Sequence, residues 1–363
     1  MLFVVLLIKG WAGLKPIDLE GSNNLTISVL IPVRNEASNI PNLIRCLEAQ
    51  SYPYDKFEVI FIDDNSEDDT YEALLEKSYN SDLKLKVLKL AQAGLTYNSY
   101  KKAAITLGVK TAIGDIILLT DGDVQMGEHW VQSFADRFAM KDVKFISGPV
   151  MMNSTYFLEE MQSIEFASLI GSGAALIYYN IPVMCNGANL AFIKEVFWEV
   201  SGYDDNKDIA SGDDEFLMYK VSKKYPGEVS FLKSPHSIVT IKAIRSFKEF
   251  YYQRRRWSGK WRKHANINSK ILAVYIFFVH TSFLMLLLLL VIQNIALLSI
   301  ILLFLVKLIV EYVFFKKIFR FYAKTLNIFP FVISSLLYSV YAITFGILSN
   351  IGGYKWKGRQ YKN

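Results

Sequence analysis

The 363-residue chain contains little cysteine, and its last third contains almost no acid. Its two cysteines, Cys46 and Cys185, have no CxxC or other metal-ligand spacing, which argues against a zinc site and predicts two buried, reduced thiols. Residues 251–363 carry 16 Lys and Arg against one acid, whereas residues 1–250 carry 24 against 33. A net charge of +15 beside long apolar runs indicates a lipid bilayer as partner, and no nucleic acid partner is expected.

The N-terminal stretch, "MLFVVLLIKGWAGLKP", lacks the basic start and the small-residue cleavage site of a secretory signal peptide. Its run of eight apolar residues is also too short to cross a bilayer, for which about 20 residues are needed. Two interpretations of residues 1–20 stay open: an interfacial apolar anchor, and the remnant of a longer span.

Short apolar runs alternate with helical patterns from residue 25 to about residue 147. The runs lie at 25–33, 57–64, 85–90, 115–121 and 143–147. Between the first two, Ile40, Leu43, Ile44 and Leu47 recur at helical spacing. This alternation predicts a Rossmann-like α/β domain with a mostly parallel sheet and helices on both faces. In such sheets ligands bind at the carboxyl ends of the strands.

The C-terminal part contains three long apolar runs that predict membrane spans, at residues 271–292, 294–315 and 328–349. Lys307 and Glu311 lie one helical turn apart in the second run and are expected to pair. The basic segment before the first run predicts an integral protein of the cytoplasmic membrane. The domain that precedes this segment in the sequence is expected to face the cytoplasm. After three spans the basic tail would lie outside, so either one run is re-entrant or the tail departs from the positive-inside rule.

Residues 251–261 read "YYQRRRWSGKW" and belong to a helical pattern that precedes the first apolar run. Gln253, Arg256 and Trp257 stand at positions i, i+3 and i+4 and therefore share one helix face. An amide, a guanidinium and an indole suit pyrophosphate neutralisation and sugar stacking. Arg254 and Arg255 point elsewhere and are expected to contact lipid phosphate. The alternative is that the whole cluster is only the positive flank of a membrane anchor.

Acidic pairs follow two of the predicted strands. Asp63 and Asp64 close the run at 57–64, where they either form a solvated Asx-type turn or accept hydrogen bonds from a nucleotide. Asp121 and Asp123 follow the run at 115–121. Two carboxylates at i and i+2 on such a loop can converge on a hard divalent cation, and the glycine between them allows a close turn.

A third acidic pair, Asp213 and Asp214, opens a predicted helix in "SGDDEFL". Acids at a helix start often only cap the helix and complement its dipole. The functional alternative is a general base directed at an acceptor hydroxyl.

Taken together, these motifs resemble the family-2 glycosyltransferases of GT-A fold, in particular the membrane-integrated members. The segments that carry the resemblance are "IPVRNEASNI" (31–40), "DDNS" (63–66), "KKAAITLGVKTAIGDIILLTDGD" (101–123), "CNGANLAF" (185–192), "GDDEFL" (212–217) and "QRRRW" (253–257). The resemblance covers about residues 25–265. It implies that the 1–20 segment is followed by a GT-A domain at 21–245, an interfacial amphipathic helix at 246–270 and a transmembrane region at 271–363.

The resemblance also implies a role for each matching residue. A nucleotide-diphosphate sugar would be bound by Pro32, Asn35, Glu36, Asp63, Asp64, Lys102 and Asp121. Asp123, together with Asp121, would hold Mg²⁺ or Mn²⁺ on the diphosphate. Asp214 would be the general base, and Gln253, Arg256 and Trp257 would contact the acceptor and the pyrophosphate.

Three positions depart from the usual family pattern. Asp213 stands where a glutamate is commoner, Asn65 replaces a glycine after the first acidic pair, and Tyr100 replaces a glycine before the lysine pair. The last change puts close backbone approach in doubt at that point.

The expected function is an inverting transfer of a sugar from a nucleotide-diphosphate sugar to a lipid-linked or saccharide acceptor. The resemblance implies a UDP-sugar, which is the commoner donor in the family. The QxxRW motif favours a processive polysaccharide synthase instead, whereas only three predicted spans make a thin channel for one chain. A third alternative is a membrane-tethered binding or scaffold protein with an inactive GT-A domain.

Overall fold

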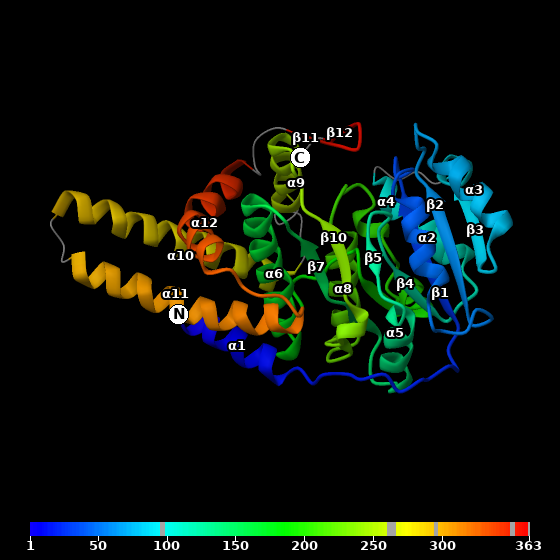
Figure 1. The fold of residues 1–363 in the computed structure, drawn as a ribbon, viewed down its shortest axis with the longest axis horizontal. Helices are drawn as coiled ribbons and strands as arrows, with labels where there is room; N and C mark the ends of the chain where they lie inside the picture. Colours follow the sequence, from blue (N-terminus) through cyan, green and yellow to red (C-terminus); the bar gives the residue numbers. More distant parts are fainter. Residues whose placement is uncertain (95–98, 260–265, 294–296, 349–352, 362–363) are drawn as a thin grey trace. The chain divides into compact units, whose positions relative to one another are not determined.

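The computed structural model describes residues 1–94, 99–259, 266–293, 297–348 and 353–361 (Figure 1). The chain forms two compact units. The sheet unit consists of Gly13–Met151 and Leu176–Lys242, and the helical unit of Met1–Ala12, Met152–Ala175 and Ala243–Asn363. The change of unit after Lys242 lies close to the expected boundary at residue 245. Met152–Ala175 groups with the C-terminal helices although it precedes that boundary.

A seven-stranded sheet forms the core of the sheet unit, with the order β3-β2-β1-β4-β8-β6-β9. Its strands are β1 Ile27–Val33, β2 Phe57–Asp63, β3 Lys84–Lys89, β4 Ile116–Leu119, β6 Phe145–Ser147, β8 Leu190–Ile193 and β9 Val229–Phe231. Strand β8 runs antiparallel to β4 and β6, and the other pairs are parallel. The predicted mostly parallel α/β sheet is therefore confirmed.

Helices cover this sheet. They are α2 Ile40–Glu48, α3 Thr70–Asn80, α4 Tyr100–Thr111, α5 Trp130–Ala139, α7 Lys194–Glu199 and α8 Asp213–Lys224, with single 3-10 turns at Leu90–Gln92, Asp204–Asn206 and Pro235–Ser237. Every residue of β2 is buried, so the strand is covered on both faces. Helix α4 lies directly on β1 and β2: a Cβ added to Gly108 would be 2.9 Å from Leu30 Cδ1 and 3.1 Å from Ile62 Cδ1. A second, three-stranded sheet has the order β5-β10-β7, with β5 Gln125–Met126, β10 Val239–Lys242 and β7 Val150–Asn153, and β10 runs antiparallel to β5.

Strand register brings the acidic motifs to one edge of the sheet. Val33 is opposite Asp63 in the parallel pair β1–β2, so the residues after these two strands lie beside each other. Leu119 is opposite Leu190 in the antiparallel pair β4–β8, so the residues after β4 lie beside those before β8. Because β1 and β4 are parallel neighbours, all four loops share the edge at which ligands bind in open α/β sheets.

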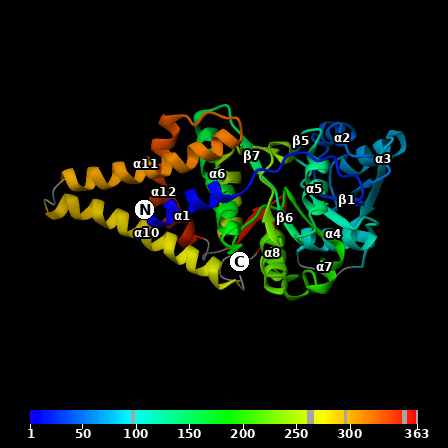
Figure 2. The same ribbon diagram turned by 90° about the horizontal axis from the view of Figure 1, so that it is seen from below.

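The helical unit contains the predicted membrane region. Its helices are α1 Leu2–Gly13, most of α6 Phe157–Tyr178, α9 Phe247–Gly259, α10 Ile267–Gln293, α11 Leu297–Phe321 and α12 Ile328–Leu348, and a hairpin, β11 Tyr354–Trp356 and β12 Arg359–Tyr361, follows. Three stretches are long and apolar enough to cross a membrane: Ile267–Leu286, Leu297–Phe321 and Ile328–Leu348. Figure 2 shows α10 and α11 running side by side. Residues 260–265 of the predicted interfacial helix, 294–296 of the second predicted span and 349 of the third lie outside the described residues.

Polar side chains connect the three apolar helices. Lys307 Nζ lies 2.8 Å from Glu311 Oε2, as predicted from their spacing. Ser335 of α12 joins this pair, with its Oγ 2.6 Å from each charged group. His280 Nδ1 of α10 lies 2.9 Å from Ser339 Oγ of α12. Such hydrogen bonds hold membrane helices together because the alternative is an unsatisfied polar group in hydrocarbon.

Helix α1 packs within the helical unit through aromatic contacts. The ring of Phe3 lies 5.3 Å from that of Tyr275 in α10, and the ring of Trp11 lies 5.5 Å from that of Phe321 in α11. The two cysteines form no disulfide in the described part of the chain. Both are half-buried rather than buried, so this part of the prediction is wrong.

Candidate active site

The loop after β1 is fastened to the loop after β2. Buried Arg34 donates from Nη1 to the carbonyl oxygens of Asp64, at 2.9 Å, and Asn65, and its Nη2 lies 2.6 Å from Glu67 Oε1. Asn35 N–H donates to Ser66 Oγ at 3.0 Å, and Glu67 N–H donates to Asn35 Oδ1 at 2.8 Å. These contacts fix Asn35 at the edge of the sheet. The segment at residues 31–40 was recognised from the sequence, but the role of Arg34 was not, because its partners lie 30 or more residues away.

Left-handed backbone makes both turns possible. Asn35 has φ of 54° and Asn65 has φ of 53°. Asparagine tolerates this conformation better than other side chains with a Cβ, which explains why Asn65 can stand where the family usually has glycine. The departure at this position therefore leaves the turn intact.

The acidic pair after β2 is buried. Asp63 and Asp64 are each 4% exposed. The carboxylate oxygens of Asp63 accept weakly from Ser66 N–H, at 3.3 and 3.4 Å, and because both acids are buried the alternative of a solvated Asx-type turn is wrong. The backbone N–H of Asp64 continues the β1–β2 ladder by donating to Val33 O at 2.8 Å. Glu36 is also buried, and its Oε2 accepts from Asn39 Nδ2 at 2.6 Å, so its carboxylate supports the loop.

Gly122 packs against the β1 loop. A Cβ added to Gly122 would lie 2.9 Å from Val33 Cγ1 and 3.1 Å from Glu36 Cγ. The loop that carries Asp121 and Asp123 can therefore approach β1 this closely only with glycine at its centre. Asp121 is half-buried in this arrangement and Asp123 is exposed.

Lys101 of α4 brings two of the acidic motifs together. Its Nζ lies 2.8 Å from Asp121 Oδ1 and 3.3 Å from Asp213 Oδ2. Burial alone would lower the pKa of Lys101, but Asp121, Asp213 and Asp214 raise it above its ordinary range. Burial alone would raise the pKa of Asp213, but the charges of Lys101 and Lys102 hold it below its ordinary value. Lys101 and Asp213 are therefore both charged at neutral pH.

Asp214 is held by the loop before β8. Its Oδ2 accepts from Gly187 N–H at 3.0 Å, and its Oδ1 accepts from Glu215 N–H at 2.8 Å. Gly187 leaves room for its neighbours, because a Cβ there would lie 3.1 Å from Lys101 Nζ and 3.2 Å from Asp213 Oδ2. Hydrogen bonds from backbone N–H groups favour the ionised carboxylate, which is the form a general base requires.

The structure places the two lysines of α4 differently from the prediction. Lys102, expected at the donor site, is fully buried, and its Nζ donates to Asn206 O at 2.8 Å and lies 4.7 Å from the ring centre of Phe216. Lys101 is the lysine that reaches the acidic cluster. Sequence reasoning missed it because the two residues are adjacent, and only the packing of α4 decides which one faces the cluster.

The residues after β4 fit a divalent cation that is bound together with a diphosphate. No group of three or more His, Cys, Asp or Glu side chains with metal-ligand geometry occurs among the described residues. Exposed Asp123 offers hard oxygen ligands, and Asp121 shares one of its oxygens with Lys101. One or two carboxylates completed by substrate phosphates and water are the usual surroundings of Mg²⁺. Asp123, with the second oxygen of Asp121, would hold such a cation.

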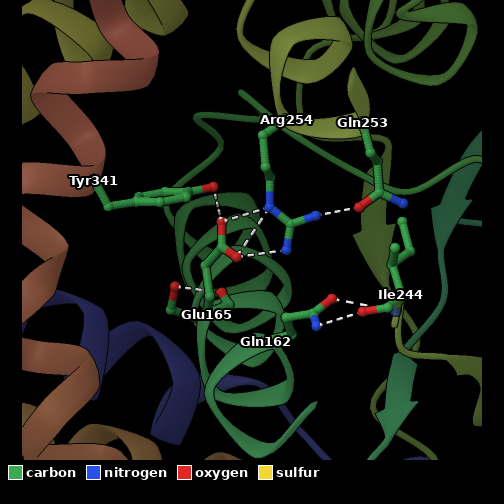
Figure 3. A network of polar contacts seen from close by, with 7 residues as sticks. Gln162, Glu165, Ile244, Gln253, Arg254 and Tyr341 are labelled. Carbon is green, nitrogen blue, oxygen red and sulfur yellow. Dashed lines mark hydrogen bonds and ion pairs between the residues drawn. The ribbon is translucent and has the colours of Figure 1, made fainter. Parts of the chain in front are cut away.

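The arginine cluster lies in the helical unit on α9. Arg254 is buried, and its Nη2 lies 2.5 Å from Glu165 Oε2 of α6 (Figure 3). Glu165 also accepts from Tyr341 Oη of α12, and Arg254 donates to Gln253 Oε1. Arg255 is buried as well. The expectation that Arg254 and Arg255 contact lipid phosphate is therefore wrong: Glu165, 89 residues earlier in the chain, provides the partner for Arg254.

Aromatic rings surround the same guanidinium. Arg254 Cζ lies 4.4 Å from the ring centre of Phe250 and 4.5 Å from that of Trp257. The ring of Trp257 lies 6.1 Å from that of Phe166. Gln253, Arg256 and Trp257 are all half-buried. The ring contact fixes Trp257 against α6, whereas Gln253 is bonded to Arg254, whose partner Glu165 lies on α6.

Two family profiles match the chain. The profile of glycosyl transferase family 2 matches residues 28–201, and that of glycosyl transferase family group 2 matches residues 116–348. The second match covers more than half of the chain and includes both the acidic cluster and the apolar helices. The chain belongs to the family-2 glycosyltransferases.

Several curated proteins are similar to this chain. Glycosyltransferase AglE of Haloferax volcanii is 32% identical over 124 residues, which are 34% of this chain and 39% of the relative. Undecaprenyl-phosphate 4-deoxy-4-formamido-L-arabinose transferase of Pseudomonas syringae is 32% identical over 100 residues, 27% of this chain and 28% of the relative. The similarity thus spans about a third of the length of these relatives.

The fold is shared with a solved mannosyltransferase. The structure of mannosyltransferase PcManGT from Pyrobaculum calidifontis, in complex with GDP-Man and Mn²⁺, has a TM-score of 0.51 and 18% identity, and the match covers 71% of this chain and 72% of that one. The likeness confirms the predicted GT-A fold of this family-2 glycosyltransferase.

Proposed function

We propose that this protein is a membrane-bound, inverting glycosyltransferase that moves a sugar from a nucleotide-diphosphate sugar to a lipid-linked acceptor. Membership of family 2 supports the reaction class, and three apolar helices support a membrane location. A relative named for an undecaprenyl-phosphate acceptor and a structural neighbour solved with GDP-Man and Mn²⁺ support the acceptor and donor classes. The basic segment before α10 supports a catalytic unit that faces the cytoplasm.

The observation that carries the proposal is the convergence of Asp121, Asp213, Asp214 and Lys101. These residues come from the loop after β4, the start of α8 and the start of α4. Three carboxylates around one lysine need a reason beyond stability, since grouping like charges raises the free energy of the folded state. A site that binds a charged donor and removes a proton supplies that reason.

Asp214 would accept the proton of the acceptor hydroxyl, which in a polyprenyl phosphate is the P–OH group of the monoanion, while that oxygen attacks the anomeric carbon. A bond forms between this oxygen and the anomeric carbon, and the bond from the anomeric carbon to the diphosphate oxygen breaks. The nucleoside diphosphate leaves with the bonding electron pair, and the anomeric configuration inverts. Lys101 would stay ion-paired with Asp213 and Asp121, so that Asp214 is the carboxylate available to the acceptor.

The donor would lie along the edge formed by Pro32, Asn35, Glu36, Asp63 and Asp64. Asp121 and Asp123 would hold Mg²⁺ or Mn²⁺ there, and the cation would stabilise charge on the departing diphosphate. Gln253, Arg256 and Trp257 are proposed to contact the acceptor and the pyrophosphate.

A panel of nucleotide sugars incubated with the detergent-purified full chain, a polyprenyl phosphate and Mg²⁺ or Mn²⁺ tests this function. Consumption of one donor, with a lipid-linked product that carries one sugar, would support it. Products of many sugars on a gel would indicate a processive synthase. Failure of every donor to react or to bind would favour an inactive binding protein.

A further inference from the structure

The helical unit contains a large cavity. Its volume is about 820 Å³, and it is lined by α6, the segment from Ile244 to Phe247, α9 and α12. Apolar side chains such as Met161, Phe247 and Phe345 form most of its walls. Pockets of about 300–1,000 Å³ with mostly apolar walls and a few polar groups are the usual binding sites of small ligands.

The cavity opens on the apolar face of α12. Leu337 and Val340 both line it, and each is 52% exposed. Both belong to a helix that is long and apolar enough to cross a membrane. An occupant with a hydrocarbon chain can therefore enter from the bilayer without passing through water.

Polar groups lie at two places on the cavity wall. Glu165 and Tyr341 line it and belong to the network that holds Arg254 and Gln253 (Figure 3). Arg245 lines it as well; its side chain is 74% exposed, and its Nε lies 2.9 Å from Glu159 Oε1. Because Arg245 is exposed and its bond to Glu159 uses Nε, its terminal guanidinium nitrogens can donate to a phosphate while that ion pair is kept.

We propose that this cavity binds the hydrocarbon chain of the lipid-linked acceptor, a polyprenyl phosphate, with the phosphate beside Arg245. The inference rests on the proposed function for the identity of the lipid. The apolar walls suit the hydrocarbon chain of the lipid, and the opening on α12 gives that chain a route from the bilayer. The positive charge of Arg245 suits the lipid's phosphate. Phe250 and Tyr251 line the cavity one helical turn or less from Gln253, so a bound chain would lie against the helix that carries the QxxRW motif.

The test uses a polyprenyl phosphate with a photoreactive group in its chain and the full protein in lipid nanodiscs. Irradiation should label peptides from α9 and α12. Leu337→Trp and Thr344→Trp, which fill the cavity, should each lower labelling at least about tenfold. Leu336→Trp is the matched control, since Leu336 is the neighbouring exposed leucine of α12 and does not line the cavity. It should label like the wild type.

A second arm of the experiment distinguishes binding of the lipid's phosphate from binding of its hydrocarbon chain. Arg245→Gln should lower labelling by the phosphate-bearing lipid about tenfold and leave labelling by the matching polyprenol unchanged. Lys248→Gln, an exposed cation on α9, should change neither. Equal competition by phosphatidylglycerol and by unlabelled polyprenyl phosphate would overturn the acceptor assignment, because the cavity would then be a general lipid site.

The outcomes also separate this inference from the proposed function. Labelling of the cavity without any sugar transfer would support the cavity site and contradict the function. Transfer to the lipid with the same KM for lipid in wild type and both filling variants, together with unchanged labelling, would overturn the cavity site and leave the function standing. Native folding of each variant is checked by gel filtration and circular dichroism.

Discussion

Lys101 Nζ lies 3.3 Å from Asp213 Oδ2, although 112 residues separate the two in the chain. The same nitrogen lies 2.8 Å from Asp121 Oδ1, so one lysine joins the loop after β4 to the start of α8. This ion pair places Asp214, the next residue, beside Gly187. Lys101 therefore links the proposed metal-binding loop to the helix start that carries the proposed general base.

Replacing Lys101 should impair turnover strongly. Lys101→Met leaves Asp121 and Asp213 close together without a counter-charge, which disturbs both loops and the charge of the site. We expect kcat/KM for the donor to fall about 100-fold or more. Lys110→Met, at the exposed end of the same helix, is the control and should retain wild-type turnover. Equal activity of the two variants would contradict the role given to Lys101.

Gly122 should not accept even a methyl group. Gly122→Ala places a Cβ 2.9 Å from Val33 Cγ1, so the loop carrying Asp121 and Asp123 must shift. A displacement of about 1 Å in a catalytic site can cost about 100-fold in rate, and we expect a loss of that order in steady-state assays. Gly127→Ala is the matched control, because no heavy atom of the described residues lies within 4 Å of its added Cβ. A fully active Gly122→Ala would show that the loop adjusts freely.

The Arg254–Glu165 pair should matter for stability. The two side chains are 2% and 12% exposed, so removing either partner leaves a buried charge without its counter-charge. Arg254→Met or Glu165→Met should each lower the free energy of unfolding by about 3–5 kcal/mol, and the double variant should recover much of the loss. Thermal unfolding in detergent measures these differences. Lys248→Met, an exposed cation on the same helix, provides the baseline. Additive losses in the double variant would show that the pair is not coupled.

Glu58 should make the stability of the sheet unit depend on pH. Burial alone would raise the pKa of Glu58, but Ile113 N–H, Lys86 and Ser28 hold it below its ordinary value of 4.5. Because the pKa is lower in the folded chain, the stabilisation is complete above pH 4.5 and is lost as the pH falls through the folded pKa. Glu58→Gln should cost about 1.5–3 kcal/mol at neutral pH. The difference in unfolding temperature from wild type should shrink as the pH is lowered below 4.5. Exposed Glu76→Gln should show no such trend.

Hydrophobic pattern predicted the main strands well because each carries several consecutive buried side chains. Strands β1, β2 and β4 are buried at nearly every position, and the acidic pairs that were recognised lie at the ends of β2 and β4. Strand β5, with two residues, is too short to show any period. The antiparallel direction of β8 was equally hidden, since direction depends on how the chain returns to the sheet.

The site residues that were missed share one property: their role depends on a distant partner. Lys101 could not be distinguished from Lys102 until the packing of α4 was known, and Arg254 could not be distinguished from its neighbours without Glu165. A helical pattern shows which residues share a face, but it does not show which element that face meets. Arg254 was therefore placed toward lipid, although its face meets α6.

The most direct test of the account compares Asp214→Asn with wild type in donor turnover and donor binding. The amide can still accept from Gly187 N–H, but it cannot take a proton from the acceptor. We predict that kcat falls about 100- to 10,000-fold while the Kd for the nucleotide sugar, measured by calorimetry with Mn²⁺, stays within about threefold. Wild-type turnover by Asp214→Asn would contradict the account, because another group would then have to remove the proton.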